Sequence, residues 1–112
     1  MNDTRQAKIG LEEAIQKLQS QEKDYMEYYT RGSLRIGLYE PHKVDLQKPH
    51  EQDELYVIAN GHGRFIADGR ENDFKTGDVL FVAAGVEHKF SSFSDDFKAW
   101  VFFYGKQGGE ST

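Results

Sequence analysis

Residues 49–63 read PHEQDELYVIANGHG, a run that contains one strand and the turn that ends it. Glu54–Ala59 is rich in the aromatic and β-branched residues that favour strands. Asn60-Gly61 follows directly, and this pair favours a tight hairpin turn because both residues accept a positive φ. A second strand, antiparallel to the first, is therefore predicted over Gly63–Ala67.

Short β-runs separated by turn residues continue on both sides of this hairpin. Further strands are expected at Tyr25–Tyr29, Leu34–Tyr39, Val79–Val82, Glu87–Phe90 and Phe97–Tyr104, with shorter pieces near Val44–Leu46 and Asp73–Lys75. Many short strands without helices between them predict an all-β antiparallel sandwich or barrel. The Gly-rich tail Gly105–Thr112 is expected to be loose over its last few residues.

Residues 1–24 have a different pattern, which predicts one amphipathic N-terminal α-helix. Apolar residues recur there at helical spacing, at Ala7, Leu11, Ala14, Ile15 and Leu18. Asp3 or Thr4 is expected to cap this helix, and Gly10 to weaken its first half. One helix cannot bury its own apolar stripe, so it is expected to pack on the β-domain of residues 25–112 or on a second subunit.

The amino-acid composition limits which binding partners and which metal-ligand types are expected. The 112 residues suit one domain, and 14 basic against 19 acidic residues give a net charge of −5, which disfavours nucleic acid. No apolar run approaches the roughly 20 residues that span a bilayer, and no secretory signal is evident, so a cytoplasmic protein is expected without membrane contact. Because cysteine is absent, a transition-metal site must use histidine and carboxylate ligands.

His50, Glu54 and His88 are the candidate metal ligands. His50 and Glu54 lie four residues apart where a strand begins, and His88 lies in a later strand. Two imidazoles with one carboxylate suit Fe(II), Mn(II), Ni(II) or Zn(II). Alternate residues of a strand share one face, so Gln52 and Tyr56 are expected on the same side, unless a bulge intervenes. On spacing alone, an ordinary surface pair is the competing interpretation.

Two spaced motifs make the chain similar to the cupin superfamily. The first family motif contains His-x-His, three or four residues, Glu, six residues and Gly, and is matched at His50, Glu54 and Gly61. The second contains Gly, five residues, Pro-x-Gly, two residues and His, and is matched at Gly77, Gly85 and His88. The resemblance covers about residues 25–109 and extends to small, mostly uncharacterised bacterial cupins.

The resemblance implies a double-stranded β-helix, or jelly-roll barrel, with a divalent ion on His50, Glu54 and His88. The chain departs from the family at the first motif histidine, which is Lys48 here, a poor ligand while it is cationic. Three protein ligands are therefore expected, with Gln52, Asp53 or water able to complete the shell. Lys48 and Tyr56 are candidates to bind or protonate an anionic substrate, if they face the barrel mouth.

Family membership does not by itself name a reaction. The first hypothesis is a metal-dependent enzyme acting on a small polar or oxygenated metabolite, of the dioxygenase or isomerase type. The alternatives are a non-catalytic small-ligand binding or sensor module, and a scaffold whose metal only ties strands together. A homodimer is expected, because short edge strands need cover.

Other polar and aromatic residues are expected to be structural. His42 and His62 fall in loops, and Asp95-Asp96 is interpreted as a solvated turn. Trp100 is expected either to line the pocket or to cap the core. Core filling is the expected role of Phe65, Phe81, Phe90, Phe102 and Tyr104.

Overall fold

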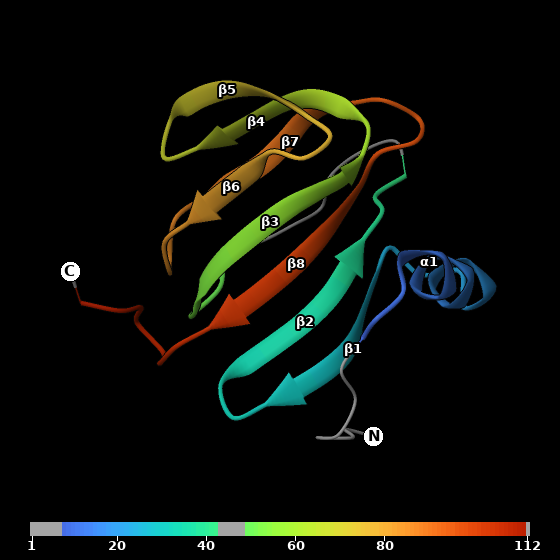
Figure 1. The fold of residues 1–112 in the computed structure, drawn as a ribbon. Coiled ribbons are helices and arrows are strands. Elements are labelled where there is room, and N and C mark those ends of the chain that lie inside the picture. Colours follow the sequence, from blue (N-terminus) through green and yellow to red (C-terminus); the bar gives the residue numbers. More distant parts are fainter. Residues whose placement is uncertain (1–7, 43–48, 112) are drawn as a thin grey trace.

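A computed structural model describes residues 8–42 and 49–111. One helix is followed by eight strands (Figure 1): α1 Leu11–Ser20, β1 Tyr25–Arg31, β2 Leu34–Tyr39, β3 Asp53–Asn60, β4 His62–Ala67, β5 Arg70–Lys75, β6 Val79–Val82, β7 His88–Phe93 and β8 Lys98–Tyr104. The seven main predicted strands are present, and the short piece at Asp73–Lys75 is the end of β5. The piece predicted near Val44–Leu46 lies outside the described residues.

The strands form two antiparallel sheets. One has five strands in the order β1-β2-β8-β3-β6, and the other has three in the order β5-β4-β7. In Figure 1 the smaller sheet lies over one end of the larger one, and α1 lies beside β1 and β2. This jelly-roll β-sandwich with one N-terminal helix confirms the predicted fold class.

The Asn60-Gly61 turn carries the chain from the larger sheet into the smaller one. The predicted hairpin was therefore wrong, because β3 pairs with β6 and β8 whereas β4 pairs with β5 and β7. Gly61 has φ of 99°, a conformation that residues with a side chain rarely adopt. A Cβ at this position would also lie 2.6 Å from Ser94 Oγ and 2.8 Å from Phe97 Cα. Glycine is therefore required both by the backbone and by the packing of this connection.

Aromatic side chains fill the space between the sheets. Phe90 on β7 is 2% exposed, and its ring centroid lies 4.7–5.3 Å from those of Tyr56, Phe65, Phe74 and Phe97. Phe65 and Phe90 are buried as predicted. The prediction was wrong for Phe81, which is 53% exposed because it points outward from β6.

Helix α1 covers part of the outer face of the larger sheet in the same chain. Ala14 and Leu18 pack with Leu38 and Trp100, and the Tyr28 hydroxyl donates a 2.6 Å hydrogen bond to the Ala14 carbonyl. Trp100 therefore caps this cluster.

The expectation that Gly10 lies inside the helix was wrong: Gly10 is the N-cap. The proposed caps Asp3 and Thr4 lie outside the described residues. This helix is too short and polar to span a membrane.

The C-terminal segment is hydrogen-bonded to the start of β3 as far as Glu110. The Gly108 amide donates to the Glu51 carbonyl at 2.7 Å, and the Glu110 amide to Asp53 Oδ2 at 2.9 Å. The Ala84 amide donates to Asp53 Oδ1 at 2.9 Å. The backbone amides of Glu110 and Ala84 donate to the Asp53 carboxylate and lower its pKa. The buried Asp53 thus ties three segments together, one residue before Glu54.

Candidate metal centre

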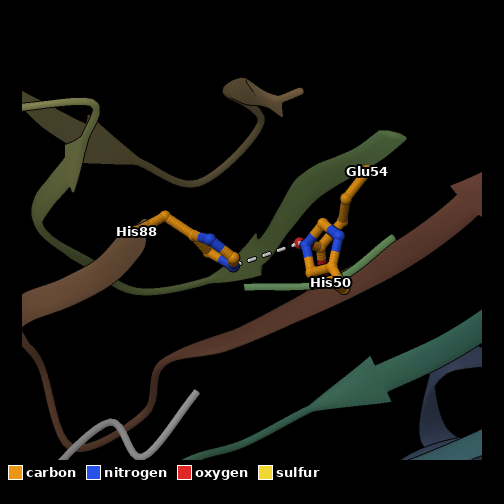
Figure 2. A group of neighbouring side chains, drawn as sticks. All are labelled: His50, Glu54 and His88. Atoms are coloured by element: carbon orange, nitrogen blue, oxygen red, sulfur yellow. Dashed lines mark hydrogen bonds and ion pairs between the residues drawn. The ribbon is translucent and has the colours of Figure 1, made fainter. Parts of the chain in front are cut away.

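His50, Glu54 and His88 come together at one end of the sandwich, where the two sheets meet. His50 lies three residues before the start of β3, Glu54 is the second residue of β3, and His88 begins β7 in the opposite sheet. Figure 2 shows the three side chains pointing toward one another. One ligand atom from each lies within 4.8 Å of the others. The fold therefore brings together the three residues that the sequence analysis selected.

Glu54 is the centre of this cluster. Its Oε1 lies 2.6 Å from His50 Nε2 and 3.3 Å from His88 Nε2, and the two imidazole centroids are 4.9 Å apart. The side chains of Glu54 and His88 are 1% and 0% exposed, whereas that of His50 is 16% exposed. A ligand approaching from solvent would therefore meet the cluster on its His50 side.

Backbone carbonyls orient both imidazoles. His50 Nδ1 lies 2.7 Å from the Gln52 carbonyl oxygen, and His88 Nδ1 lies 2.9 Å from that of Val86. A carbonyl oxygen can only accept a hydrogen bond, so each Nδ1 carries the proton. In the neutral tautomers each Nε2 then offers a lone pair to the cluster, which is how protein histidines are prepared for a metal.

The carboxylate of Glu54 is charged and incompletely satisfied. Burial acts to raise its pKa, but the hydrogen bonds and positive charge that His50 and His88 supply when Nε2 is also protonated outweigh burial, and the pKa lies below its usual range. Among the residues described, Glu54 Oε2 has no hydrogen-bond partner. A buried carboxylate oxygen without a partner is costly. A cation between the two Nε2 atoms and this carboxylate would remove that cost, so the donor set fits a divalent transition ion.

The remaining predicted site residues lie elsewhere. The Gln52 amide faces away from the cluster: its Nε2 donates to the carbonyls of Ser33 and Gly105 at 2.8 and 2.9 Å, and its Oε1 accepts from Arg35. Alternation fails at Gln52 because β3 begins only at Asp53. Tyr56 is in the core, fully buried, with its ring 6.3 Å from that of His88. Lys48 lies outside the described residues.

A cavity of about 670 Å³ lies beside His50 and was not predicted from the sequence. Arg35, Ser33, Gln52 and Gly105 are among its lining residues. The sequence did contain an indication of this cavity. Arg35 alternates with the inward-facing Gly37 and Tyr39 along β2, and a charged residue on the inner face of a strand is unusual. A second cavity, of about 750 Å³, runs along β5 and β6, and none of the three candidate ligands lines it.

The histidines and carboxylates that were not expected to belong to the site lie at the surface. His42 Nδ1 lies 2.8 Å from Asp24 Oδ1, and both side chains are exposed. His62, Asp95 and Asp96 are also exposed. His42 lies outside the strands and Asp95-Asp96 forms a turn, as predicted, whereas the loop prediction was wrong for His62, which begins β4.

Comparisons with known proteins agree with the observed fold. The family described as "Cupin domain" matches residues 36–104. An uncharacterized protein of Streptomyces coelicolor is 33% identical over 81 residues, which are 70% of this chain and 77% of that protein. The transcriptional activator RhaS of Mannheimia succiniciproducens is 31% identical over 55 residues, 49% of this chain but only 20% of RhaS. A cupin protein of Bacteroides fragilis has a TM-score of 0.58 at 16% identity, with 92% of this chain and 84% of that one covered.

Proposed function

The chain belongs to the cupin domain family, and on this premise we propose that it holds a divalent transition ion, Zn, Ni, Fe or Mn, on His50, Glu54 and His88. The observation that carries the proposal is the convergence of two Nε2 atoms on a buried carboxylate while both Nδ1 atoms are held by carbonyls. Three protein ligands leave coordination positions open for a substrate, unlike a closed structural site.

We propose that the protein is a metal-dependent enzyme acting on a small polar or oxygenated metabolite. A bound ion would supply Lewis acidity toward a substrate oxygen. The chain supports this with a dry inner side, formed by Tyr56 and Phe65 against His88, and with a cavity that opens beside His50. A site that is buried behind the ligands and accessible in front of one of them suits binding of a small molecule.

A non-catalytic ligand-binding or sensor module is the second candidate. The 31% identity to part of a transcriptional activator favours it, although that match covers only half of this chain. Both candidates use the same cavity, and turnover distinguishes them. The cytoplasmic location and the absence of a nucleic-acid partner stay predictions from the sequence.

Metal content tests the proposal directly. Purified protein incubated with Zn, Ni, Mn or Fe(II) and then desalted is expected to retain about one ion per chain, measured by elemental analysis. A chain that stays metal-free with all four ions would contradict the proposal. For the loaded protein, a screen of small oxygenated metabolites with oxygen uptake recorded would identify a dioxygenase. Conversion without oxygen uptake would indicate an isomerase, and binding alone a sensor.

We propose that a second copy of the chain covers the outer face of β6. The larger sheet exposes an apolar surface there, with Val79 61% and Phe81 53% exposed, next to the outward-facing Leu55 and Val57 of β3. In the described part of the chain β6 pairs only with β3, so its other edge can accept a strand. Antiparallel pairing of β6 with β6 of a second copy is self-complementary about a two-fold axis.

Replacing Phe81 with lysine is therefore expected to convert a dimer into a monomer. Light scattering should give about twice the chain mass of 12.9 kDa for the wild type and the single chain mass for Phe81→Lys. Ser91→Lys is the matched control, because Ser91 is exposed on the edge strand β7 of the other sheet and does not line the cavity beside Phe81. A wild-type monomer at micromolar concentration, or a Phe81→Lys dimer, would reject this interface.

A further inference from the structure

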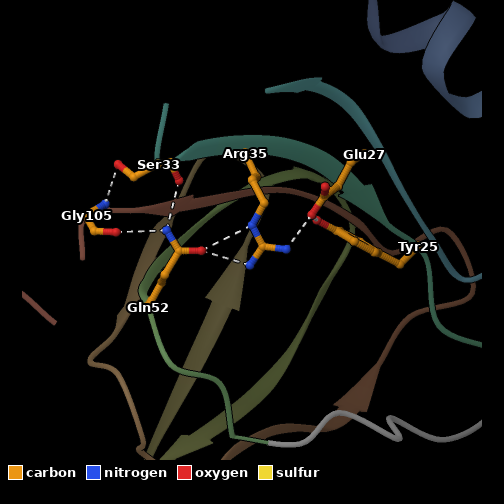
Figure 3. Close-up of polar contacts among 6 residues, drawn as sticks. All are labelled: Tyr25, Glu27, Ser33, Arg35, Gln52 and Gly105. Atoms are coloured by element: carbon orange, nitrogen blue, oxygen red, sulfur yellow. Dashed lines mark hydrogen bonds and ion pairs between the residues drawn. The ribbon is translucent and has the colours of Figure 1, made fainter. Parts of the chain in front are cut away.

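Arg35 lies on the inner face of β2, at the end of the sandwich that holds the candidate metal centre. Gly37, two residues along the same face, makes room for Tyr25: a Cβ there would lie 2.7 Å from the Tyr25 ring and 2.8 Å from its hydroxyl. Tyr25 and Arg35 can therefore approach each other from neighbouring strands, with Glu27 between them (Figure 3).

The guanidinium of Arg35 is held in one orientation. Its Nη1 donates to Glu27 Oε2 at 2.8 Å, and the Tyr25 hydroxyl donates to the same oxygen at 2.9 Å. Its Nε and Nη2 donate to Gln52 Oε1 at 3.1 and 3.0 Å. Two carbonyls accept from the Gln52 amide nitrogen, so the amide oxygen must face Arg35. The guanidinium also stacks over the Phe103 ring at 4.3 Å.

This arrangement leaves part of the guanidinium available to a ligand. Arginine has five N–H groups, and these contacts use three of them. One N–H therefore remains on each terminal nitrogen without a partner in the residues described. Two such N–H groups match the two oxygens of a carboxylate. The Arg35 side chain is 39% exposed, and it lines the cavity beside His50.

The same cavity places Arg35 near the metal centre. The centre of the Phe103 ring lies 4.3 Å from the Arg35 guanidinium carbon and 4.9 Å from the centre of the His50 ring. The guanidinium carbon and the His50 ring centre are therefore at most 9.2 Å apart, which is the sum of these two distances. A molecule of a few carbon atoms can bridge this span. Glu27 offsets the charge of Arg35, Glu54 is the one carboxylate offered to a divalent ion, and Glu51 adds a negative charge to the cavity wall. The attraction for an anion therefore comes from the directed N–H groups of Arg35 and the open metal positions, and not from the net charge of the cavity.

We infer that Arg35 binds the carboxylate of a small oxygenated acid in the cavity beside His50. A small oxygenated acid would then be the substrate class of the proposed metal site. The inference depends on the proposed function only for the presence of the metal. Gln52 and Glu27 are positioning residues, because they contact the guanidinium and fix its direction. Arg35 itself is the group that contacts the ligand.

Isothermal titration of zinc-loaded and metal-free protein with pyruvate and succinate, and with their neutral amides pyruvamide and succinamide, tests this inference. Zinc-loaded wild type is expected to bind the acids and not the amides. Arg35→Gln should weaken acid binding about tenfold or more while zinc content is unchanged. Arg35→Lys, which keeps the charge but loses the paired donors, should bind with intermediate affinity and guards against a folding defect in the first variant.

Arg64→Gln is the matched control, because Arg64 forms its ion pairs with Glu71 and Asp73 on the outer surface of the smaller sheet. It should bind the acids as the wild type does. Equal affinity of wild type and Arg35→Gln, or equal binding of acids and amides, would overturn the inference. If the wild type took up none of the four ions, the metal proposal would fail, whereas acid binding to metal-free protein that depends on Arg35 would still support this inference.

Discussion

Replacing His88 with alanine is expected to remove most of the bound metal. His88 supplies one of three candidate protein ligands, and its side chain is fully buried, so no neighbouring solvent-exposed group can take its place. Loss of an outer contact to a metal ligand already costs 10–100-fold in affinity, so loss of a ligand should cost about 100-fold or more. Elemental analysis after desalting should show near-complete loss of the ion from His88→Ala.

His42→Ala is the control for this experiment. His42 is also a histidine close to an acidic residue, Asp24, but its side chain is 63% exposed and it does not belong to the cluster. Its replacement should leave metal content unchanged. Equal metal loss in both variants would point to non-specific binding, and full retention in His88→Ala would show that the ion is held elsewhere.

The strands could be predicted because their sequences carry their own signals. Turn residues bound most of them, and the observed ends differ from the predicted ones by a few residues, as for Glu87–Phe90, which extends to Phe93 in β7. The direction of β6 could not be predicted. Its sequence, VLFV, is apolar on both faces, so alternation does not indicate that Val79 and Phe81 point outward.

The candidate site was only partly predictable, for a reason of topology. His50 and Glu54 are close in sequence, but their approach to His88 depends on how β3 and β7 meet across two sheets, which spacing along the chain cannot give. The motif resemblance supplied that information. Arg35 was missed because it reaches the cavity through contacts with Glu27, Gln52 and Phe103, which come from three other segments.

Replacing Phe90 with alanine is expected to lower the free energy of unfolding by about 3–5 kcal/mol, a large part of the roughly 5–15 kcal/mol available to a domain of this kind. Phe90 is 2% exposed and packs against aromatic rings from both sheets, so the neighbours can close the resulting cavity only in part. Urea denaturation followed by Trp100 fluorescence would measure this loss. Phe90→Leu, which keeps most of the volume, should cost less than half as much.

Comparing Phe90→Ala with His88→Ala distinguishes a variant that destabilises the fold from one that removes a metal ligand. Phe90 lies one layer below the ligands, since its ring contacts Tyr56 and Phe65, whose rings in turn lie near His88. Zinc binds only the folded chain in this scheme, so it should raise the denaturation midpoint of Phe90→Ala as it does for the wild type. Zinc should leave the midpoint of His88→Ala unchanged. If zinc failed to stabilise Phe90→Ala as well, the aromatic core itself would be needed to hold His88 in position for the metal.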